Sequence, residues 1–288
     1  MLKPDHNAFS DRCYEHIKII CVEEAKPANN SAVTAIFVRT MIPKTLHYCW
    51  FGAATKPASF ERCLQSWKRF CPDYDIVEWN EQNYASFQNQ FIQDALRKRS
   101  YAFAADALRV EILWAQGGIY LDTDMLLLKP LDSLLTHDFF TGYEVEGRPA
   151  YGLFGAVPEH PIVEEMCAFY RNHRFDVFSP PVITHAFKEV VHQTNLGAHD
   201  IILEPSVFYP LPYEHRGEDY QSFVQEETLA VHLWDHSWKK AKENSFWNHF
   251  KKIHTVAVDT LFYGYPWAYW KRYTKEFARK AYHQLKRS

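Results

Sequence analysis

The stretch Gly117-Gly118-Ile119-Tyr120-Leu121-Asp122-Thr123-Asp124 decides the fold class of this chain. Two glycines end the preceding helical pattern, as glycine commonly does at a helix C-terminus. The apolar run that follows predicts a short buried strand, and two aspartates come directly after it. Because ligands of α/β proteins gather at the carboxyl ends of parallel strands, the stretch predicts both a strand and a binding site at its end.

The segments around this stretch alternate between strand and helix patterns. Helical spacing is found in residues 60–70, 87–99 and 101–116, and strand patterns in residues 46–52, 74–79, 125–128, 139–143 and 153–157. This alternation predicts an α/β fold in which a mostly parallel central sheet is covered by helices.

Size and charge limit the classes of function. A chain of 288 residues with 47% hydrophobic and 23% charged residues can bury a sizeable core. The net charge of −3 gives no global attraction for nucleic acid, so no nucleic-acid partner is expected. The segment from Lys239 to Ser288, however, holds 12 Lys/Arg and 3 Asp/Glu, a balance of +9. A basic tail of this kind predicts its own anionic partner, for which a membrane surface is the first candidate.

The sequence divides into three parts. Residues 1–40 form an N-terminal extension with mixed charge, for which two interpretations stand open: Met41 is the natural start, or the extension is a small subdomain. Residues 41–240 are the expected catalytic domain, and residues 241–288 are a basic, aromatic, helical extension.

Cysteine use and targeting signals predict the compartment. The six cysteines are scattered without a C-x-x-C pair, which fits a reducing cytosol. No apolar segment reaches the length of a transmembrane span, and the N-terminus does not resemble a signal peptide. We therefore expect a cytoplasmic location, at the inner face of the cytoplasmic membrane if the basic tail binds lipid.

The two aspartates suit a metal. Asp122 and Asp124 stand two residues apart around a turn and can reach one hard cation, for which Mn²⁺ or Mg²⁺ is better suited than zinc. Such an ion neutralises charge that develops on a departing nucleoside diphosphate. The competing interpretation is that the two acids only cap a turn.

Three neighbouring features strengthen the metal interpretation, although each has a structural alternative. Asp106 and Arg109 share one helix face, where they suit ribose and phosphate or simply pair with each other. Trp50 ends the first strand, where it stacks on a base or fills the core. His232 opens the segment 232–238 and is a third metal ligand or an ordinary surface histidine.

Together, residues 46–52, 105–109 and 117–124 resemble the sugar-binding region of D-x-D glycosyltransferases. The chain is most similar to glycosyltransferase family 32, which includes yeast-type mannosyltransferases, α-galactosyltransferases and bacterial capsule or lipopolysaccharide enzymes. The glucosylating domains of large clostridial toxins resemble the chain through the same segments. The resemblance covers roughly residues 41–240.

The resemblance implies a GT-A fold and a metal-dependent hexosyltransferase that retains anomeric configuration. By position, Asp124 and His232 resemble metal ligands, and Asp122 contacts metal and ribose. The donor it implies is a nucleotide-sugar, either a UDP-sugar or GDP-mannose, and the acceptor is a saccharide or a lipid-linked glycan in surface polysaccharide synthesis. The predicted donor-binding residues are Trp50, Asp106, Arg109, Tyr120, Asp122, Ser237 and Trp238, with Arg109, Asp122 and Asp124 as the catalytic set. Tyr143, Glu144 and Tyr151 are expected near the acceptor.

Two other functions use the same residues. A metal-dependent nucleotidyltransferase or phosphotransferase would place the acidic pair on a nucleotide in a similar way. A non-catalytic module would bind the nucleotide-sugar without turnover.

The C-terminal segment has its own pattern. Trp267, Trp270, Tyr273 and Phe277 recur every three or four residues, and most cations fall elsewhere around the helix. This pattern is typical of a helix that lies on an anionic membrane, near a lipid-linked acceptor. The competing interpretation is that the apolar face packs on the catalytic domain.

Overall fold

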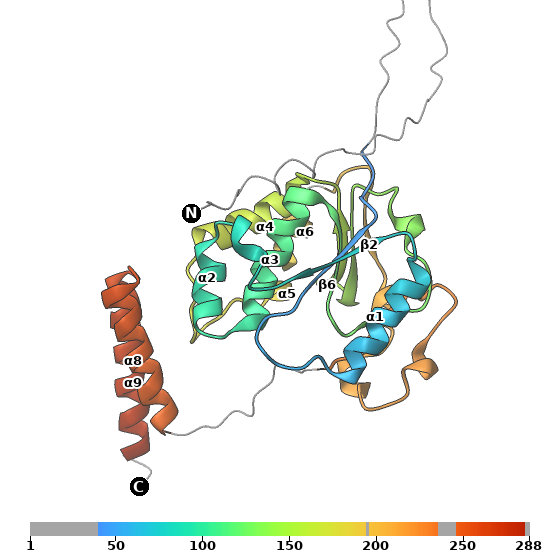
Figure 1. Cartoon of the computed structure of the whole chain (residues 1–288). Coiled ribbons are helices and arrows are strands. Elements are labelled where there is room, and N and C mark those ends of the chain that lie inside the picture. Colours follow the sequence, from blue (N-terminus) through green and yellow to red (C-terminus); the bar gives the residue numbers. More distant parts are fainter. Residues whose placement is uncertain (1–39, 194–195, 236–245, 286–288) are drawn as a thin grey trace, which may run out of the picture.

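The structure is a computed structural model that describes residues 40–193, 196–235 and 246–285 (Figure 1). The predicted extension 1–40 therefore lies almost entirely outside the described residues. The main helices and strands, in chain order, are β1 (Thr45–Cys49), α1 (Ala58–Phe70), β2 (Asp75–Trp79), α2 (Gln90–Arg97), α3 (Tyr101–Gln116), β3 (Gly118–Leu121), β4 (Met125–Leu127), β5 (Phe139–Val145), β6 (Arg148–Ala156), α4 (Pro161–Asn172), α5 (Ile183–Ala186), α6 (Lys188–Gln193), β7 (Asp200–Leu203), α7 (Pro205–Phe208), β8 (Ala230–His232), α8 (Phe246–Phe262) and α9 (Trp267–Leu285).

Within the described residues, six strands form one sheet in the order β2-β1-β3-β6-β5-β7. β1 pairs in parallel with β2 and β3, and β5 pairs in parallel with β7. β6 is antiparallel to both of its neighbours. The five remaining strands of this sheet all run in the same direction. The predicted α/β fold with a mostly parallel sheet is confirmed.

Helices cover both faces of the sheet and create two apolar cores. α2, α3 and α4 lie on one face, and α1 lies on the other (Figure 1). β3 serves both cores because side chains alternate along a strand. Tyr120 packs toward α3, whereas Ile119 and Leu121 pack toward α1. The strand that precedes the two aspartates is therefore fixed from both sides.

Strand β4 departs from the main sheet. The sequence predicts a continuation of the extended chain after the aspartates, and β4 does continue it, but it pairs antiparallel with β8 in a separate two-stranded sheet. Trp67 of α1 is fully buried against this small sheet, and its Nε1 donates a hydrogen bond to the Met125 carbonyl at 2.7 Å. This contact holds β4 at the end of β3.

Some boundaries differ from the predicted ones. α2 begins at Gln90 rather than at residue 87, because the Asn89 side chain accepts hydrogen bonds from the backbone N–H groups of Phe91 and Ile92. β6 begins at Arg148, five residues before the predicted strand 153–157. The sequence patterns used above do not predict α4, β7 or β8.

The C-terminal extension is helical, as predicted. α8 and α9 pack on each other as a hairpin (Figure 1). Tyr269 and Tyr273 of α9 are buried, and the Tyr273 ring stacks on Phe178, which lies between α4 and α5, at 3.9 Å between centroids. For Tyr273 the packing interpretation is therefore correct. None of the helices in the described residues is both long and apolar enough to cross a membrane.

Candidate active site

The aspartate motif occupies a turn that two strands hold in place. The Asp122 N–H donates to the Gly152 carbonyl of β6 at 2.6 Å, and the Met125 N–H donates to the Asp122 carbonyl at 2.9 Å. Where β4 pairs with β8, His232 lies opposite Met125. The Leu233 N–H donates to the Asp124 carbonyl at 3.0 Å. A short strand far along the chain thus delivers a histidine to the motif.

The three predicted metal ligands come together in the structure. Ligand atoms of Asp122, Asp124 and His232 all lie within 4.8 Å of one another. His232 Nε2 lies 3.1 Å from Asp124 Oδ1. Two carboxylates and an imidazole from a turn and a strand are a donor set that suits Mn²⁺ or Mg²⁺. The residues present therefore fit the divalent cation that the resemblance implies.

The electrostatics of this cluster also fit a cation. Burial raises the pKa of Asp122, and the charge of Asp124 raises it further, whereas Arg109 opposes both. Burial lowers the pKa of His232, but the charge of Asp124 and its hydrogen bond outweigh that effect and leave the pKa raised. Among the described residues, the buried His232 Nδ1 has no hydrogen-bond partner. A cation among these groups compensates the repulsion between the two carboxylates.

Arg109 links the predicted Asp106 to the aspartate motif. Its Nη2 lies 2.9 Å from Asp106 Oδ1 and 3.0 Å from Asp122 Oδ1. Its Nη1 donates to the Tyr151 carbonyl at 2.6 Å, and only 5% of the residue is exposed. The intrahelical ion pair is therefore present, and it extends to Asp122. Burial raises the pKa of Asp106 to about 7, although Arg109 opposes that shift.

Two predicted ligand contacts do not fit the structure. Tyr120 is 1% exposed and lies under the Arg109 guanidinium, 4.3 Å from ring centroid to guanidinium carbon. It supports Arg109 and has no surface for a nucleotide. Tyr151 is 1% exposed, and its hydroxyl donates to the Phe187 carbonyl at 3.1 Å. Both side chains point into the core under α3 because of strand alternation, so Tyr151 does not line an acceptor pocket.

The remaining predicted residues have mixed outcomes. Trp50 follows β1 and is half-buried, with its ring 5.9 Å from Phe60, so one part packs and another stays accessible. Glu144 near the end of β5 pairs with Arg148 at 3.0 Å, and its charge contributes to the raised pKa of His232. Its charge therefore acts on the cluster, and Tyr143 beside it is half-buried. The predicted pair Ser237 and Trp238 lies outside the described residues.

Sequence reasoning missed two residues of the site. The Tyr209 hydroxyl accepts hydrogen bonds from the Gly152 and Leu153 N–H groups at 3.2 Å, and its ring packs edge-on against His232. A Cβ at Gly152 would lie 2.9 Å from Asp122 Oδ2. Tyr209 stands in no motif. A glycine directly before the predicted strand 153–157 was the available signal of a close approach at Gly152.

Comparison with known proteins finds a family model that matches the region of the aspartate motif. The glycosyltransferase sugar-binding region containing a DXD motif matches residues 57–141, which include α1, α2, α3 and the aspartate turn. This stretch of the chain is therefore similar to the sugar-binding region of DXD glycosyltransferases. β3, which leads into the DXD motif, lies beside the reversed strand β6.

Curated relatives of the DXD region are themselves named as glycosyltransferases. Human alpha-1,4-N-acetylglucosaminyltransferase is 26% identical over 186 residues, which cover 59% of this chain and 50% of that protein. Mouse lactosylceramide 4-alpha-galactosyltransferase is 29% identical over 46% of this chain and 40% of that protein. The chain thus spans about half the length, or less, of these relatives.

Solved structures with similarity include the PaToxG glycosyltransferase, at 18% identity and a TM-score of 0.44, covering 54% of this chain and 70% of that chain. Mouse xyloside xylosyltransferase 1 is 9% identical with a TM-score of 0.40, covering 65% of this chain and 96% of that chain.

Proposed function

We propose that this chain is a metal-dependent hexosyltransferase that moves a sugar from a nucleotide-diphosphate sugar to a saccharide or lipid-linked acceptor. One observation carries the proposal: Asp122, Asp124 and His232 converge within 4.8 Å at the end of β3, inside a DXD glycosyltransferase region. A pair of acids that only capped a turn would not need a histidine delivered from 108 residues further along the chain.

Each residue of the site has a distinct task in this proposal. Asp122, Asp124 and His232 hold Mn²⁺ or Mg²⁺, which when bound compensates charge on the leaving diphosphate. Arg109 fixes the Asp122 carboxylate through an ion pair at 3.0 Å. The same guanidinium nitrogen pairs with Asp106 at 2.9 Å and so holds that carboxylate next to Asp122. The accessible part of Trp50 stacks on the base. Arg109 itself is bound on three sides, so its effect on phosphate acts chiefly through Asp122.

The donor, stereochemistry and cellular role are finer parts of the same proposal. The relatives are named for transfer of N-acetylglucosamine and galactose, which makes UDP-sugars of these two kinds the first donors to test and GDP-mannose the next. We propose that the anomeric configuration is retained. The proposed setting is surface polysaccharide synthesis, such as capsule formation, in the cytoplasm at the inner face of the cytoplasmic membrane.

A screen of nucleotide-sugars with and without Mn²⁺ tests the activity. We expect Mn²⁺-dependent release of a nucleoside diphosphate from one donor, and a loss of at least about 100-fold in Asp124→Asn, because the variant removes one charged ligand. Asp75→Asn is the matched control, since Asp75 is an exposed aspartate at the start of β2.

Each alternative function has its own signature in the same assay. Release of a nucleoside monophosphate or pyrophosphate identifies a nucleotidyltransferase or phosphotransferase. Donor binding without any turnover identifies a binding module. Full Mn²⁺-dependent turnover by Asp124→Asn contradicts the proposed site.

A further inference from the structure

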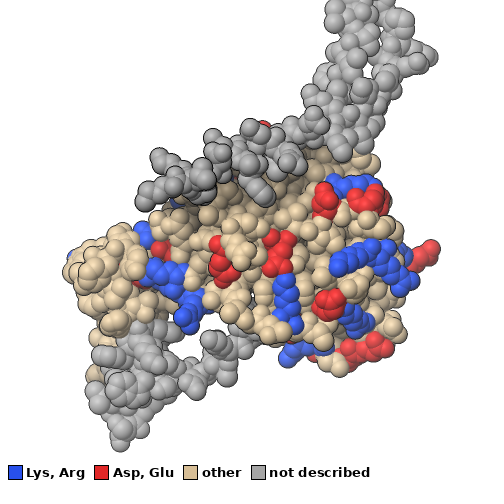
Figure 2. All heavy atoms as spheres, in the orientation of Figure 1, with Lys and Arg blue, Asp and Glu red and all other residues tan. Residues whose placement is uncertain are grey.

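The last residues of α8 and the first residue of α9, on either side of the hairpin turn, expose large apolar side chains. Leu261, Phe262 and Trp267 are 69%, 76% and 57% exposed, and we call these three residues the aromatic tip. Figure 2 shows this end of the hairpin as a largely uncharged lobe at the left of the view. Exposed apolar side chains gathered in one short segment mark an interaction surface rather than a random surface position.

The buried core of the hairpin does not include the aromatic tip, although the Trp267 ring lies 6.3 Å from the Trp270 ring beside that core. This small core consists of Val256, Tyr265, Tyr269 and Tyr273, all buried, with Phe178 packed against them. The tip residues point away from this core although they lie within a few positions of it. Neither the folding of the hairpin nor its packing against Phe178 therefore depends on the tip side chains.

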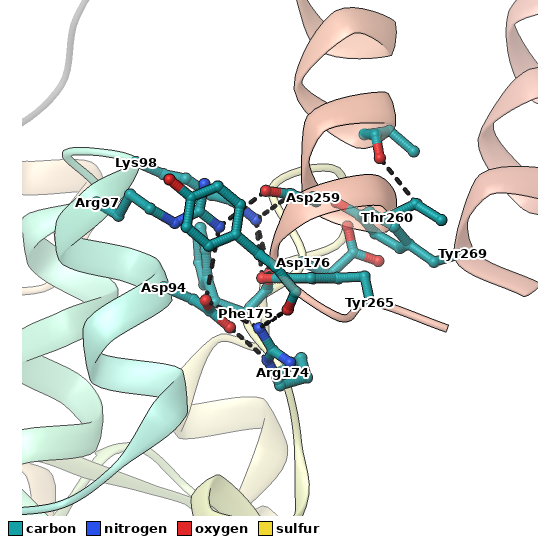
Figure 3. A network of polar contacts seen from close by, with 12 residues as sticks. Asp94, Arg97, Lys98, Arg174, Phe175, Asp176, Asp259, Thr260, Tyr265 and Tyr269 are labelled. Atoms are coloured by element: carbon teal, nitrogen blue, oxygen red, sulfur yellow. Dashed lines mark hydrogen bonds and ion pairs between the residues drawn. The ribbon is translucent and has the colours of Figure 1, made fainter. Parts of the chain in front are cut away.

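A polar network anchors the hairpin to the catalytic domain beside the tip (Figure 3). Asp259 of α8 pairs with Arg97 at 2.8 Å and with Lys98 at 2.6 Å. Asp259 is fully buried, and the side chain of Lys98 is 5% exposed. The Tyr265 hydroxyl donates to the Phe175 carbonyl at 2.8 Å. A buried network of this kind fixes the orientation of the tip relative to α2, which is followed by the site-bearing helix α3.

A second feature continues the surface along α9. Trp267, Lys271, Lys275 and Tyr282 are spaced by four, four and seven residues, so they share one face of the helix. All four are exposed, whereas Tyr269 and Tyr273 lie on the opposite, buried face. The exposed face thus combines aromatic rings at its ends with two ammonium groups between them.

We propose that the aromatic tip, Lys271 and Lys275 dock the chain on an anionic lipid surface. The tip enters the boundary between headgroups and acyl chains, and the lysines lie on the anionic headgroups. Charge complementarity favours this partner, because the segment from Lys239 to Ser288 carries +9 while the rest of the chain carries −12. This docking does not depend on the proposed glycosyl transfer. The lipid contact is made by exposed residues, and the buried Tyr273 takes no part in it.

Co-sedimentation of the full chain with lipid vesicles tests this docking. We expect strong binding to vesicles of phosphatidylcholine mixed with phosphatidylglycerol and weak binding to phosphatidylcholine alone. The triple substitution Leu261→Ser, Phe262→Ser, Trp267→Ser should lower the partition coefficient about tenfold or more. Lys271→Glu combined with Lys275→Glu should lower it by a similar factor on the mixed vesicles only.

Matched controls keep the test decisive. Val224→Ser changes an apolar residue that is 37% exposed far from the hairpin in sequence, and it should leave vesicle binding unchanged. Thermal unfolding of each variant checks the fold, which the exposed tip should not affect. Point substitutions are preferable to truncation before Tyr265, because truncation would remove the residues that bury Phe178 and Val256.

Three results would overturn the docking proposal. The triple variant could bind the mixed vesicles as well as the original chain. Binding could be equal on vesicles with and without phosphatidylglycerol. Sedimentation could instead show a dimer that the triple substitution dissociates, which would assign the tip to a second copy of the chain. Donor hydrolysis by the same variants reports separately on the proposed transfer reaction.

Discussion

His47 is a buried histidine whose hydrogen bonds require the neutral form. Its Nδ1 accepts from Trp79 Nε1 at 3.2 Å, which leaves the proton on Nε2, 3.1 Å from the Gly117 carbonyl. Burial lowers the pKa of His47 to about 4 from its ordinary value near 6.5. The imidazole therefore belongs to the structure that supports β3 and is not a ligand group.

This shift predicts a pH-dependent stability. The unfolded chain binds the proton at higher pH than the folded chain, so the stabilisation is fully present above about pH 6.5 and is lost as pH falls toward 4. The loss from this residue amounts to about 3 kcal/mol in the free energy of unfolding. Denaturant unfolding measured between pH 7 and 4 should show that the free energy of unfolding depends less steeply on pH in His47→Gln than in the original chain. His185→Gln, at an exposed position, should keep the original slope.

Gly152 gives a prediction about the site itself. A methyl group there would lie 2.9 Å from Asp122 Oδ2 and 3.1 Å from the Tyr209 hydroxyl. Gly152→Ala should therefore displace the Asp122 carboxylate and lower donor turnover by about 10- to 100-fold. The expected cost in stability is about 1–3 kcal/mol. Gly217→Ala is the control, since a Cβ there meets nothing within 4 Å; equal activity in both variants would contradict this account.

At the scale of single residues, the sequence predicts those that belong to a motif. Asp122, Asp124 and His232 gain their signal from the resemblance of the surrounding segments rather than from their residue types alone, and the structure brings them together. Tyr209 carries no such signal, because its role depends on a loop folding back onto β6. Tyr120 is the reverse case, a residue that was predicted to contact the ligand but is buried. Its place inside the motif indicates a ligand contact, but strand alternation turns its side chain into the core.

At the scale of elements, long periodic segments were predictable and short paired ones were not. α3 has the predicted bounds because sixteen residues carry a consistent helical character and end at glycine. β8 has three residues and exists only because β4 pairs with it. No local pattern marks such a strand. The path by which His232 reaches the aspartate motif could therefore not be predicted from sequence.

The hairpin interface supplies a prediction at the same scale. Asp259 is fully buried between Arg97 and Lys98, so Asp259→Ala leaves the buried Lys98 ammonium without its carboxylate. We expect a loss of about 3–5 kcal/mol in the stability of the docked hairpin. Limited proteolysis should then cleave the chain between β8 and α8 faster than in the original chain. Thr260→Ala, one position further on, should change the cleavage rate little, because its hydroxyl bonds only within α8.

At the scale of the whole molecule, the fold class was predictable but the assembly of the site was not. Alternating strand and helix patterns predict a parallel sheet, and five of the six strands described in the main sheet share one direction. The sequence does not reveal that β6 enters between β3 and β5. That insertion supplies the Gly152 carbonyl and the Tyr151 carbonyl, which hold Asp122 and Arg109 respectively.

Metal binding is the prediction that involves the molecule as a whole. A ligand that binds only the folded chain stabilises it by about 2.7 kcal/mol at a concentration 100 times its dissociation constant. Mn²⁺ should therefore raise the melting temperature of the chain, because its three ligands come from a turn and a strand that meet only in the folded state. Asp124→Asn should abolish most of this increase, and Asp75→Asn should preserve it. An equal increase in both variants, measured by differential scanning calorimetry with and without a chelator, would place the ion elsewhere.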